Sequence, residues 1–376
     1  MKLGNIVTYG EEVLDTFDRR GFGPVDSLIL SWASYLKLSA PEPKVQAWQG
    51  VRFGDLFRAE HFKALFPATW DTPESRQLFT AMAASPRFRD IRVKGYTEQT
   101  DPEREKQFAA VSFQLNKDLC YVVFRGTDST LVGWKEDFNM AFQYPVPAQK
   151  AAAEYLAEAA KHCTGSLRVG GHSKGGNLAV YAAAKAGGAL QKRIVQVYSH
   201  DGPGFLESVL KSGEWSAIAP KIHKTLPQSS LVGMLLEQQE NFRVVRSDKF
   251  SIWQHDPFSW QVEDGDLCYV DALTPGAQYL DRTLNRWVSG LSVLERERFV
   301  DSLYGLVDTA KITSLAQLFS DWQESIPALL RAASQLDEDT REFLFQTVKA
   351  LIALGVKNYP EMRSLREGQE ESNGVQ

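Results

Sequence analysis

The sequence predicts an α/β fold, in which a mostly parallel central sheet is flanked by helices. Strand-like and helix-forming runs alternate between about residues 91 and 275, as is typical of such a sheet. In the middle of this region a serine, Ser173, lies in a glycine-rich turn between a β-prone run and an alanine-rich helical run. The stretches before and after the region are mainly helical. We therefore expect an α/β core with N-terminal and C-terminal helical additions.

The chain divides into four expected segments. Its 376 residues suit one core domain with additions, and a hydrophobic content of 43% is enough to form a sizeable core. We expect residues 1–90 to form a helical and loop-rich segment that packs on the core. Residues 91–275 form the core itself, residues 276–362 a helical bundle, and residues 363–376 a charged, disordered tail.

Composition excludes several classes of partner. The formal net charge of −5 gives no overall attraction to nucleic acid.

The three cysteines are widely spaced without a C-x-x-C pair, which argues against a disulfide framework or a cysteine zinc site and fits a reducing compartment. Acidic residues at 11–15 interrupt the region where a signal peptide would be apolar, and no segment has the length of a membrane span. We expect a cytoplasmic, soluble protein.

The turn around Ser173 has the pattern of a nucleophile elbow. Residues 171–175 read Gly-His-Ser-Lys-Gly, which matches G-x-S-x-G between a strand and a helix. In such a turn the serine takes a strained backbone conformation, and glycines two positions away avoid collisions with neighbouring backbone. The helix that follows directs its positive N-terminal end toward the serine. Ser173 is therefore the candidate nucleophile.

Strands predicted on either side of the elbow supply further candidates. Runs at 111–115 and 119–124 predict two strands joined by a turn, and a helix is expected at 148–163. The second strand ends in Arg-Gly-Thr-Asp at 125–128, where the amide of Thr127 could form half of an oxyanion hole. Taken alone, the tetrapeptide favours a plain β-turn over this role.

Beyond the elbow, a strand is expected at 194–198, then a polar and helical passage, then a strand at 242–246. His255, just past this last strand, is the histidine that gives the chain order serine, acid, base. His200 is the alternative base.

Three aspartates are candidates for the residue that orients the base. Asp201 directly follows a predicted strand and precedes a glycine-rich and proline-rich turn. Asp248 also lies between Ser173 and His255 in the sequence, but only seven residues before the histidine, and Asp256 adjoins it. We favour Asp201, because the carboxyl ends of neighbouring parallel strands meet at one edge of the sheet, with Asp248 as the alternative.

These motifs together resemble those of a known family. Residues 124–127 read Phe-Arg-Gly-Thr, with Trp134 and Asp137 soon after, and residues 171–176 read Gly-His-Ser-Lys-Gly-Gly. With the Gln-His-Asp segment at 254–256, the chain resembles bacterial lipase-like α/β hydrolases of unassigned function, which are related to lipase class 3. The resemblance covers about residues 1 to 275 and implies the α/β-hydrolase fold.

The resemblance also implies roles for individual residues. It makes Ser173 the nucleophile, His255 the base, and the backbone amides of Thr127 and Lys174 the oxyanion hole. Class 3 lipases usually have leucine where this chain has Lys174, which we expect to bring a charge near the site. They also place the acid after a later strand, where residues 227–230 here read Pro-Gln-Ser-Ser.

The sequence therefore predicts a serine hydrolase that cleaves a carboxylic ester, such as a lipid or other acyl ester, through an acyl-enzyme. Neither a metal nor an organic cofactor is implied. Two alternatives remain: a catalytically silent hydrolase fold that acts as a binding or regulatory module, and a thioesterase or peptidase on the same fold.

Overall fold

The chain forms two compact units in a computed structural model that describes residues 3–127, 131–236, 241–312, 322–350 and 353. The first unit comprises residues 1–101, 107–126 and 147–273. The second comprises residues 102–106, 127–146 and 274–376. The tail expected at 363–376 lies outside the described residues.

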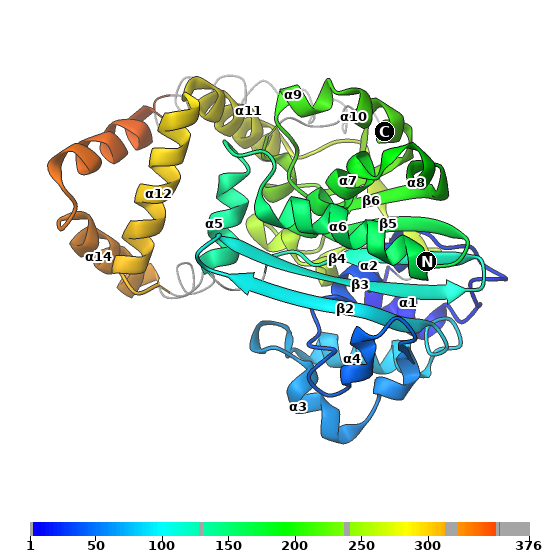
Figure 1. Ribbon diagram of the computed structural model, residues 1–376. Helices are drawn as coiled ribbons and strands as arrows, with labels where there is room; N and C mark the ends of the chain where they lie inside the picture. Colours follow the sequence, from blue (N-terminus) through cyan, green and yellow to red (C-terminus); the bar gives the residue numbers. More distant parts are fainter. Residues whose placement is uncertain (1–2, 128–130, 237–240, 313–321, 351–352, 354–376) are drawn as a thin grey trace, which may run out of the picture. The chain divides into compact units, whose positions relative to one another are not determined.

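A nine-stranded sheet forms the centre of the first unit (Figure 1). Its strands, in spatial order, are β1 (Val51–Arg52), β2 (Arg92–Asp101), β3 (Lys106–Asn116), β4 (Leu119–Phe124), β5 (Ser166–His172), β6 (Ile194–His200), β7 (Ile222–Pro227), β8 (Phe242–Val245) and β11 (Tyr269–Val270). A separate two-stranded sheet pairs β9 (Val262–Glu263) with β10 (Asp266–Leu267).

The central five strands, from β4 to β8, are parallel to one another. Strand β4 lies antiparallel to β3, and β11 lies antiparallel to β8. The apolar run of β4 is almost wholly buried, as a strand covered on both faces requires. This mostly parallel sheet with flanking helices is the α/β-hydrolase fold, and the fold class predicted from the sequence is confirmed.

Helices of the first unit flank this sheet. The α-helices are α1 (Ile6–Glu12), α2 (Pro24–Ala33), α3 (Phe62–Leu65), α4 (Pro73–Ala84), α6 (Pro147–His162), α7 (Lys174–Lys185), α8 (Gly187–Arg193), α9 (Glu207–Leu210) and α10 (Gly213–Ile218). The 3₁₀ turns are η1 (Pro43–Gln46), η2 (Phe53–Leu56), η3 (Ala59–His61), η4 (Ala68–Trp70), η5 (Ala219–Lys221), η6 (Val232–Met234), η7 (Ser251–His255) and η8 (Pro257–Ser259).

Two glycines of β5 show which helix covers which face of the sheet. A Cβ on Gly170 would collide with Tyr121, whose hydroxyl bonds to Ser27 of α2. A Cβ on Gly171 would instead collide with the backbone of Gly175 in α7. Because successive strand residues point to opposite faces, α2 and α7 pack on opposite sides of β5.

Strand β7 was missed by the sequence analysis, which expected a polar and helical passage in this part of the chain. Its sequence, Ile-His-Lys-Thr-Leu-Pro at 222–227, lacks the apolar run typical of a buried strand. Lys224 is nevertheless buried, and its ammonium donates to the carbonyl of Gly233. A hydrogen bond to another segment of the chain thus makes a lysine compatible with an interior strand.

The cysteines also differ from expectation. Cys120 in β4 and Cys163 after α6 are joined by a disulfide, with their Cα atoms 5.9 Å apart, whereas Cys268 is free. They are 43 residues apart in the sequence, and their proximity arises from the packing of α6 against β4. Wide spacing argued against a disulfide framework, and the structure has a single bridge, between this pair.

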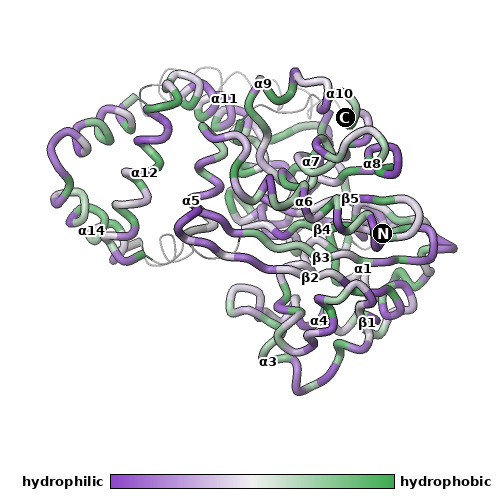
Figure 2. Tube along the Cα trace, in the orientation of Figure 1, coloured by the Kyte–Doolittle hydropathy of each residue, from purple (hydrophilic) through white to green (hydrophobic). Residues whose placement is uncertain are grey.

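The second unit is helical in its described part. It contains α5 (Leu131–Asn139), α11 (Pro275–Gly290), α12 (Val293–Thr309) and α14 (Trp322–Ala333). Trp287 of α11 packs edge-on against Phe299 of α12, with ring centroids 5.0 Å apart. Figure 2 shows hydrophilic and hydrophobic residues interleaved along α12. Within the described ranges, no helix combines the length and hydrophobicity that crossing a bilayer requires.

A buried ion pair holds the N-terminal helices in the first unit. Arg87 and Asp26 are both fully buried and make two hydrogen bonds of 2.7 Å. Tyr9 of α1 donates to the same carboxylate at 3.0 Å, and Arg87 also donates to the carbonyls of Asp15 and Gly21. The network joins α1, α2 and the segment after α4.

We expect Asp26→Leu to lower the free energy of unfolding by ~3–5 kcal/mol, because it leaves the Arg87 guanidinium buried without its counter-ion. The double variant Asp26→Leu/Arg87→Met should lose less, since no unpaired charge remains. Denaturant titration measures both. Asp55→Ala, which breaks an exposed pair with Arg52, is the control and should cost under ~1 kcal/mol. Equal losses for Asp26→Leu and Asp55→Ala would contradict this account.

Candidate active site

Ser173 lies at the turn between β5 and α7 with an unusual backbone conformation. Its φ is 58° and its ψ is −136°, a region that a residue with a side chain rarely adopts. Its amide donates to the carbonyl of His200, at the end of the neighbouring strand, at 2.9 Å. The serine is 8% exposed. This geometry is that of a nucleophile elbow.

The glycines two positions either side of Ser173 are required by close backbone packing. A Cβ on Gly175 would overlap the carbonyl of Phe124, the last residue of β4. A Cβ on Gly171 would overlap both that carbonyl and the backbone of Gly175. The first turn of α7 can therefore rest on the end of β4 only without side chains at these two positions.

Asp201 and His255 are brought together although 54 residues separate them in the sequence. The Nδ1 atom of His255 lies 2.6 Å from Oδ2 of Asp201. The other carboxylate oxygen accepts from the hydroxyl of Ser230 at 2.5 Å and from the amide of Gly233 at 3.1 Å. Asp201 is fully buried with a φ of 50°. Donors on both oxygens thus hold the carboxylate in one orientation toward the imidazole.

The alternative acids have other surroundings. Asp248 is exposed, and its backbone amide donates to the carbonyl of Ser259. The carboxylate of Asp256 accepts from Lys249 at 2.5 Å and from the amide of Phe258 at 3.1 Å. Of the three candidate aspartates, Asp201 is the one whose carboxylate meets the ring of His255.

The alternative base, His200, is fully buried on the face of the sheet covered by α2. Its Nε2 contacts the hydroxyl of Ser27 at 2.8 Å, and its Nδ1 contacts that of Thr225 at 2.7 Å. Burial, with a smaller contribution from the nearby His223, lowers the pKa of His200 to about 3. A ring that is enclosed and neutral in this way stabilises the interior and is unsuited to exchanging protons with a substrate.

His255 differs from His200 because its side chain is 25% exposed. Its ring lies beside that of His172, the residue before Ser173, with centroids 4.5 Å apart. Within the described residues no hydrogen bond joins the Ser173 hydroxyl to His255. Bonds between nucleophile and base often tighten only when substrate binds.

Lys174 is the first residue of α7. The side chain of Lys174 is buried, and its ammonium donates to the carbonyl and side-chain oxygens of Gln107 at 2.9 and 2.6 Å. The charge expected near the site is therefore directed into the interior.

The end of β4 lies directly against the elbow. A Cβ on Gly126 would lie 3.0 Å from Cβ of Ser173 and 2.7 Å from the carbonyl oxygen of His172. The next residue, Thr127, belongs to the second unit, where its hydroxyl donates to Asp137. Within the Arg-Gly-Thr-Asp motif, Gly126 is thus the residue that lies against Ser173.

Two contributors to the site were missed by the sequence analysis. Ser230, which donates to Asp201, lies in the Pro-Gln-Ser-Ser segment at the end of β7. Tyr35 contacts His172 from beyond the end of α2. A tyrosine within an apolar helical pattern carries no sequence signal for such a contact.

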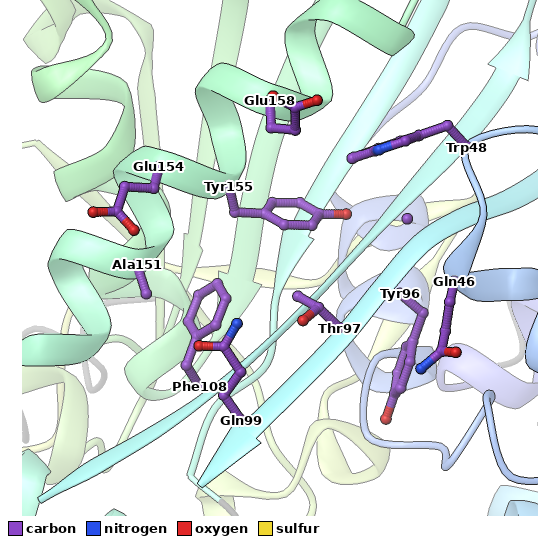
Figure 3. Close-up of a pocket in the computed structure, with 11 residues that line it drawn as sticks. Gln46, Trp48, Tyr96, Thr97, Gln99, Phe108, Ala151, Glu154, Tyr155 and Glu158 are labelled. Atoms are coloured by element: carbon purple, nitrogen blue, oxygen red, sulfur yellow. The ribbon is translucent and has the colours of Figure 1, made fainter. Parts of the chain in front are cut away.

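A cavity of about 400 Å³ lies elsewhere in the first unit (Figure 3). Its walls are mainly aromatic and polar side chains from η1 and the residues after it, β2, β3 and α6, among them Trp48, Tyr96 and Tyr155. Ser173, Asp201 and His255 do not line it. In the part of the chain that the structure describes, no three His, Cys, Asp or Glu side chains are grouped as metal ligands would be.

Comparison with known proteins gives a family and several distant structures. The model of the Mbeg1-like family matches residues 82–305. A fungal lipase in complex with an inhibitor is similar in structure, with 15% identity and a TM-score of 0.36 over 71% of this chain and 86% of the other. The lipase–propeptide complex of Rhizomucor miehei has 14% identity and a TM-score of 0.37, over 77% of this chain and 78% of the other. M37 lipase has 12% identity and a TM-score of 0.31, over 55% of this chain and 68% of the other. No curated protein matches the chain.

The lowered pKa of His200 predicts a pH-dependent stability. Between its ordinary pKa of 6.5 and about 3, the unfolded chain binds a proton that the folded chain excludes. Stability therefore falls as the pH falls through this window, by up to ~1.4 kcal/mol per pH unit from this group. Denaturant titrations at several pH values between 6 and 4.5 give the free energy of unfolding as a function of pH. In His200→Gln this free energy should fall less steeply with falling pH than in the wild type, by about this amount. Parallel curves for the two proteins would contradict the assignment.

Proposed function

Because this chain belongs to the Mbeg1-like family and has the α/β-hydrolase fold, with Ser173 at a nucleophile elbow, we propose that it is a serine hydrolase. Its substrate is a carboxylic ester, of a lipid or of another acyl compound, and the reaction passes through an acyl-enzyme intermediate. Ser173 is the nucleophile, His255 the base and Asp201 the acid that orients the base.

The observation that carries this proposal is the 2.6 Å contact between His255 Nδ1 and the buried carboxylate of Asp201. A carboxylate accepts hydrogen bonds, so this contact places the proton of a neutral imidazole on Nδ1. The Nε2 atom is then free of a proton and can accept one from a serine hydroxyl. His255 in this tautomer, with its ring beside His172 and so close to Ser173, is equipped for general base catalysis.

The proposed reaction begins with attack of the Ser173 oxygen on the ester carbonyl. His255 Nε2 takes the hydroxyl proton as the carbon–oxygen bond forms, and Asp201 stabilises the resulting imidazolium. The tetrahedral intermediate collapses, and the proton passes from His255 to the departing alcohol. Water then attacks the acyl-enzyme with His255 again acting as base, releasing the carboxylic acid and restoring Ser173.

The negative charge on the tetrahedral oxygen needs fixed donors. We assign one to the amide of Lys174 at the N-terminus of α7 and the other to the amide of Thr127. The position of Gly126 against Ser173 supports the second assignment, because Thr127 is the next residue. Each such donor typically contributes about 3 kcal/mol of transition-state stabilisation.

Labelling with a fluorophosphonate probe tests the nucleophile. The probe should modify the wild type covalently and leave Ser173→Ala unmodified, because only an activated serine displaces the fluoride. Ser166→Ala, at the start of the same strand, is the control and should be labelled like the wild type. Absence of labelling in the wild type would favour a binding or regulatory role. For a labelled protein, a panel of esters, thioesters and peptides separates the possible substrates.

Substitutions of two aspartates test the orienting acid. We expect Asp201→Asn to lower kcat for a short-chain p-nitrophenyl ester by about 10³–10⁴-fold, because an amide in place of the carboxylate no longer fixes the imidazole tautomer. Asp248→Asn changes an exposed side chain and should retain nearly full kcat. The reverse ranking of the two variants would transfer the role of acid to Asp248.

A further inference from the structure

The residue before the nucleophile, His172, has a buried ring with a partner on each nitrogen. Its side chain is 2% exposed. The Nε2 atom lies 2.8 Å from the backbone carbonyl oxygen of His255, and the Nδ1 atom lies 3.2 Å from the hydroxyl of Tyr35. Both partners belong to the first unit.

The two partners determine which nitrogen of His172 carries the proton. A carbonyl oxygen can only accept, so Nε2 donates to His255. The Nδ1 atom of a neutral ring then accepts, and the hydroxyl of Tyr35 is its donor. Burial lowers the pKa of His172 well below the usual value, and His255 and His200 lower it further, so the ring is neutral. The hydrogen bonds therefore run in one direction, from Tyr35 through His172 to His255.

Tyr35 is itself held firmly. It is 4% exposed, lies just beyond the end of α2, and its ring packs against Trp70 with centroids 4.6 Å apart. Its hydroxyl occupies the space beside Gly126, where a Cβ would overlap it. The donor to His172 is thus fixed between α2 and the end of β4.

His172 bonds to the backbone carbonyl of His255, the proposed base, whereas Asp201 bonds to its ring. His255 is the last residue of η7, a short 3₁₀ turn that follows exposed Phe250. The residue before it, Gln254, accepts from the indole of Trp260 and from the amide of Ser229. These contacts hold the turn in place, and the bond from His172 links the carbonyl of His255 to the residue that is covalently attached to Ser173.

We propose that His172 is a positioning residue that keeps the base-bearing turn in register with the nucleophile, and that Tyr35 selects the tautomer in which it does so. The proposal rests on the proposed function of Ser173 and His255. It assigns to the variable position of the G-x-S-x-G motif a task separate from the chemical steps: fixing the distance between nucleophile and base.

Steady-state kinetics on a short-chain p-nitrophenyl ester test this proposal with three variants. His172→Leu should lower kcat by roughly 10²-fold with little change in KM, because a displacement of about 1 Å at the base affects the chemical step. His172→Gln should recover most of kcat, since its amide can donate to His255 and accept from Tyr35. Tyr35→Phe should give an intermediate loss, because the donor that selects the tautomer is removed.

Matched controls separate positioning from general destabilisation. His61→Leu removes another buried histidine, whose ring lies near the carbonyl of Leu56, and Tyr198→Phe removes a hydroxyl bonded to Gln196. Both should keep the wild-type kcat. A kcat for His172→Leu equal to that of His61→Leu would overturn the proposal. So would a loss confined to KM, or a His172→Gln variant no more active than His172→Leu at equal thermal stability.

Hydrogen–deuterium exchange provides a readout that does not depend on activity. His172→Leu should increase exchange in the peptide that covers residues 251–256, and His172→Gln should not. Unchanged exchange in His172→Leu would overturn the proposal. If the wild type reacts with neither ester nor fluorophosphonate, the proposed function fails, and exchange still decides whether His172 holds the turn.

Discussion

The close approach of α7 to the end of β4 is the constraint on which the rest of the site depends. The backbone at Gly175 lies so near the carbonyl of Phe124 that no side chain fits between them. Ser173 has a positive φ next to this contact, and α7 begins at the following residue. The same proximity puts Gly126 against the serine. The close packing of backbone at this point therefore defines the surroundings of Ser173.

Differences in environment give three histidines at the strand ends different properties. His172 and His200 are enclosed, and burial lowers the pKa of each. His255 is partly exposed and has a carboxylate on one nitrogen. Because a buried imidazole without a counter-ion stays neutral, His172 and His200 are poorly suited to accepting a proton. Residue type alone would not separate them, since all three lie near Ser173 along the sheet edge.

Local patterns made much of the fold predictable, while contacts between distant segments were not. The elbow, β4 and α6 follow from short runs of residues, and the proximity of Asp201 to His255 follows from the rule that parallel strands end at one edge. In contrast, β7 has polar residues that are buried by tertiary contacts, as in the bond from Lys224 to Gly233. The bonds from Ser230 and Tyr35, and the disulfide of Cys120, depend likewise on packing between segments far apart in the sequence.

The position of Tyr35 has a consequence for where this protein can be divided. The segment that matches the family begins at residue 82. The hydroxyl that lies beside Gly126 and contacts His172 nevertheless belongs to Tyr35. Asp26, which neutralises Arg87, also precedes the match. A boundary drawn by sequence similarity would therefore cut through the interior of the first unit. The smallest autonomous form of the hydrolase-fold unit must begin upstream of α2, because the wall behind the elbow is built from there.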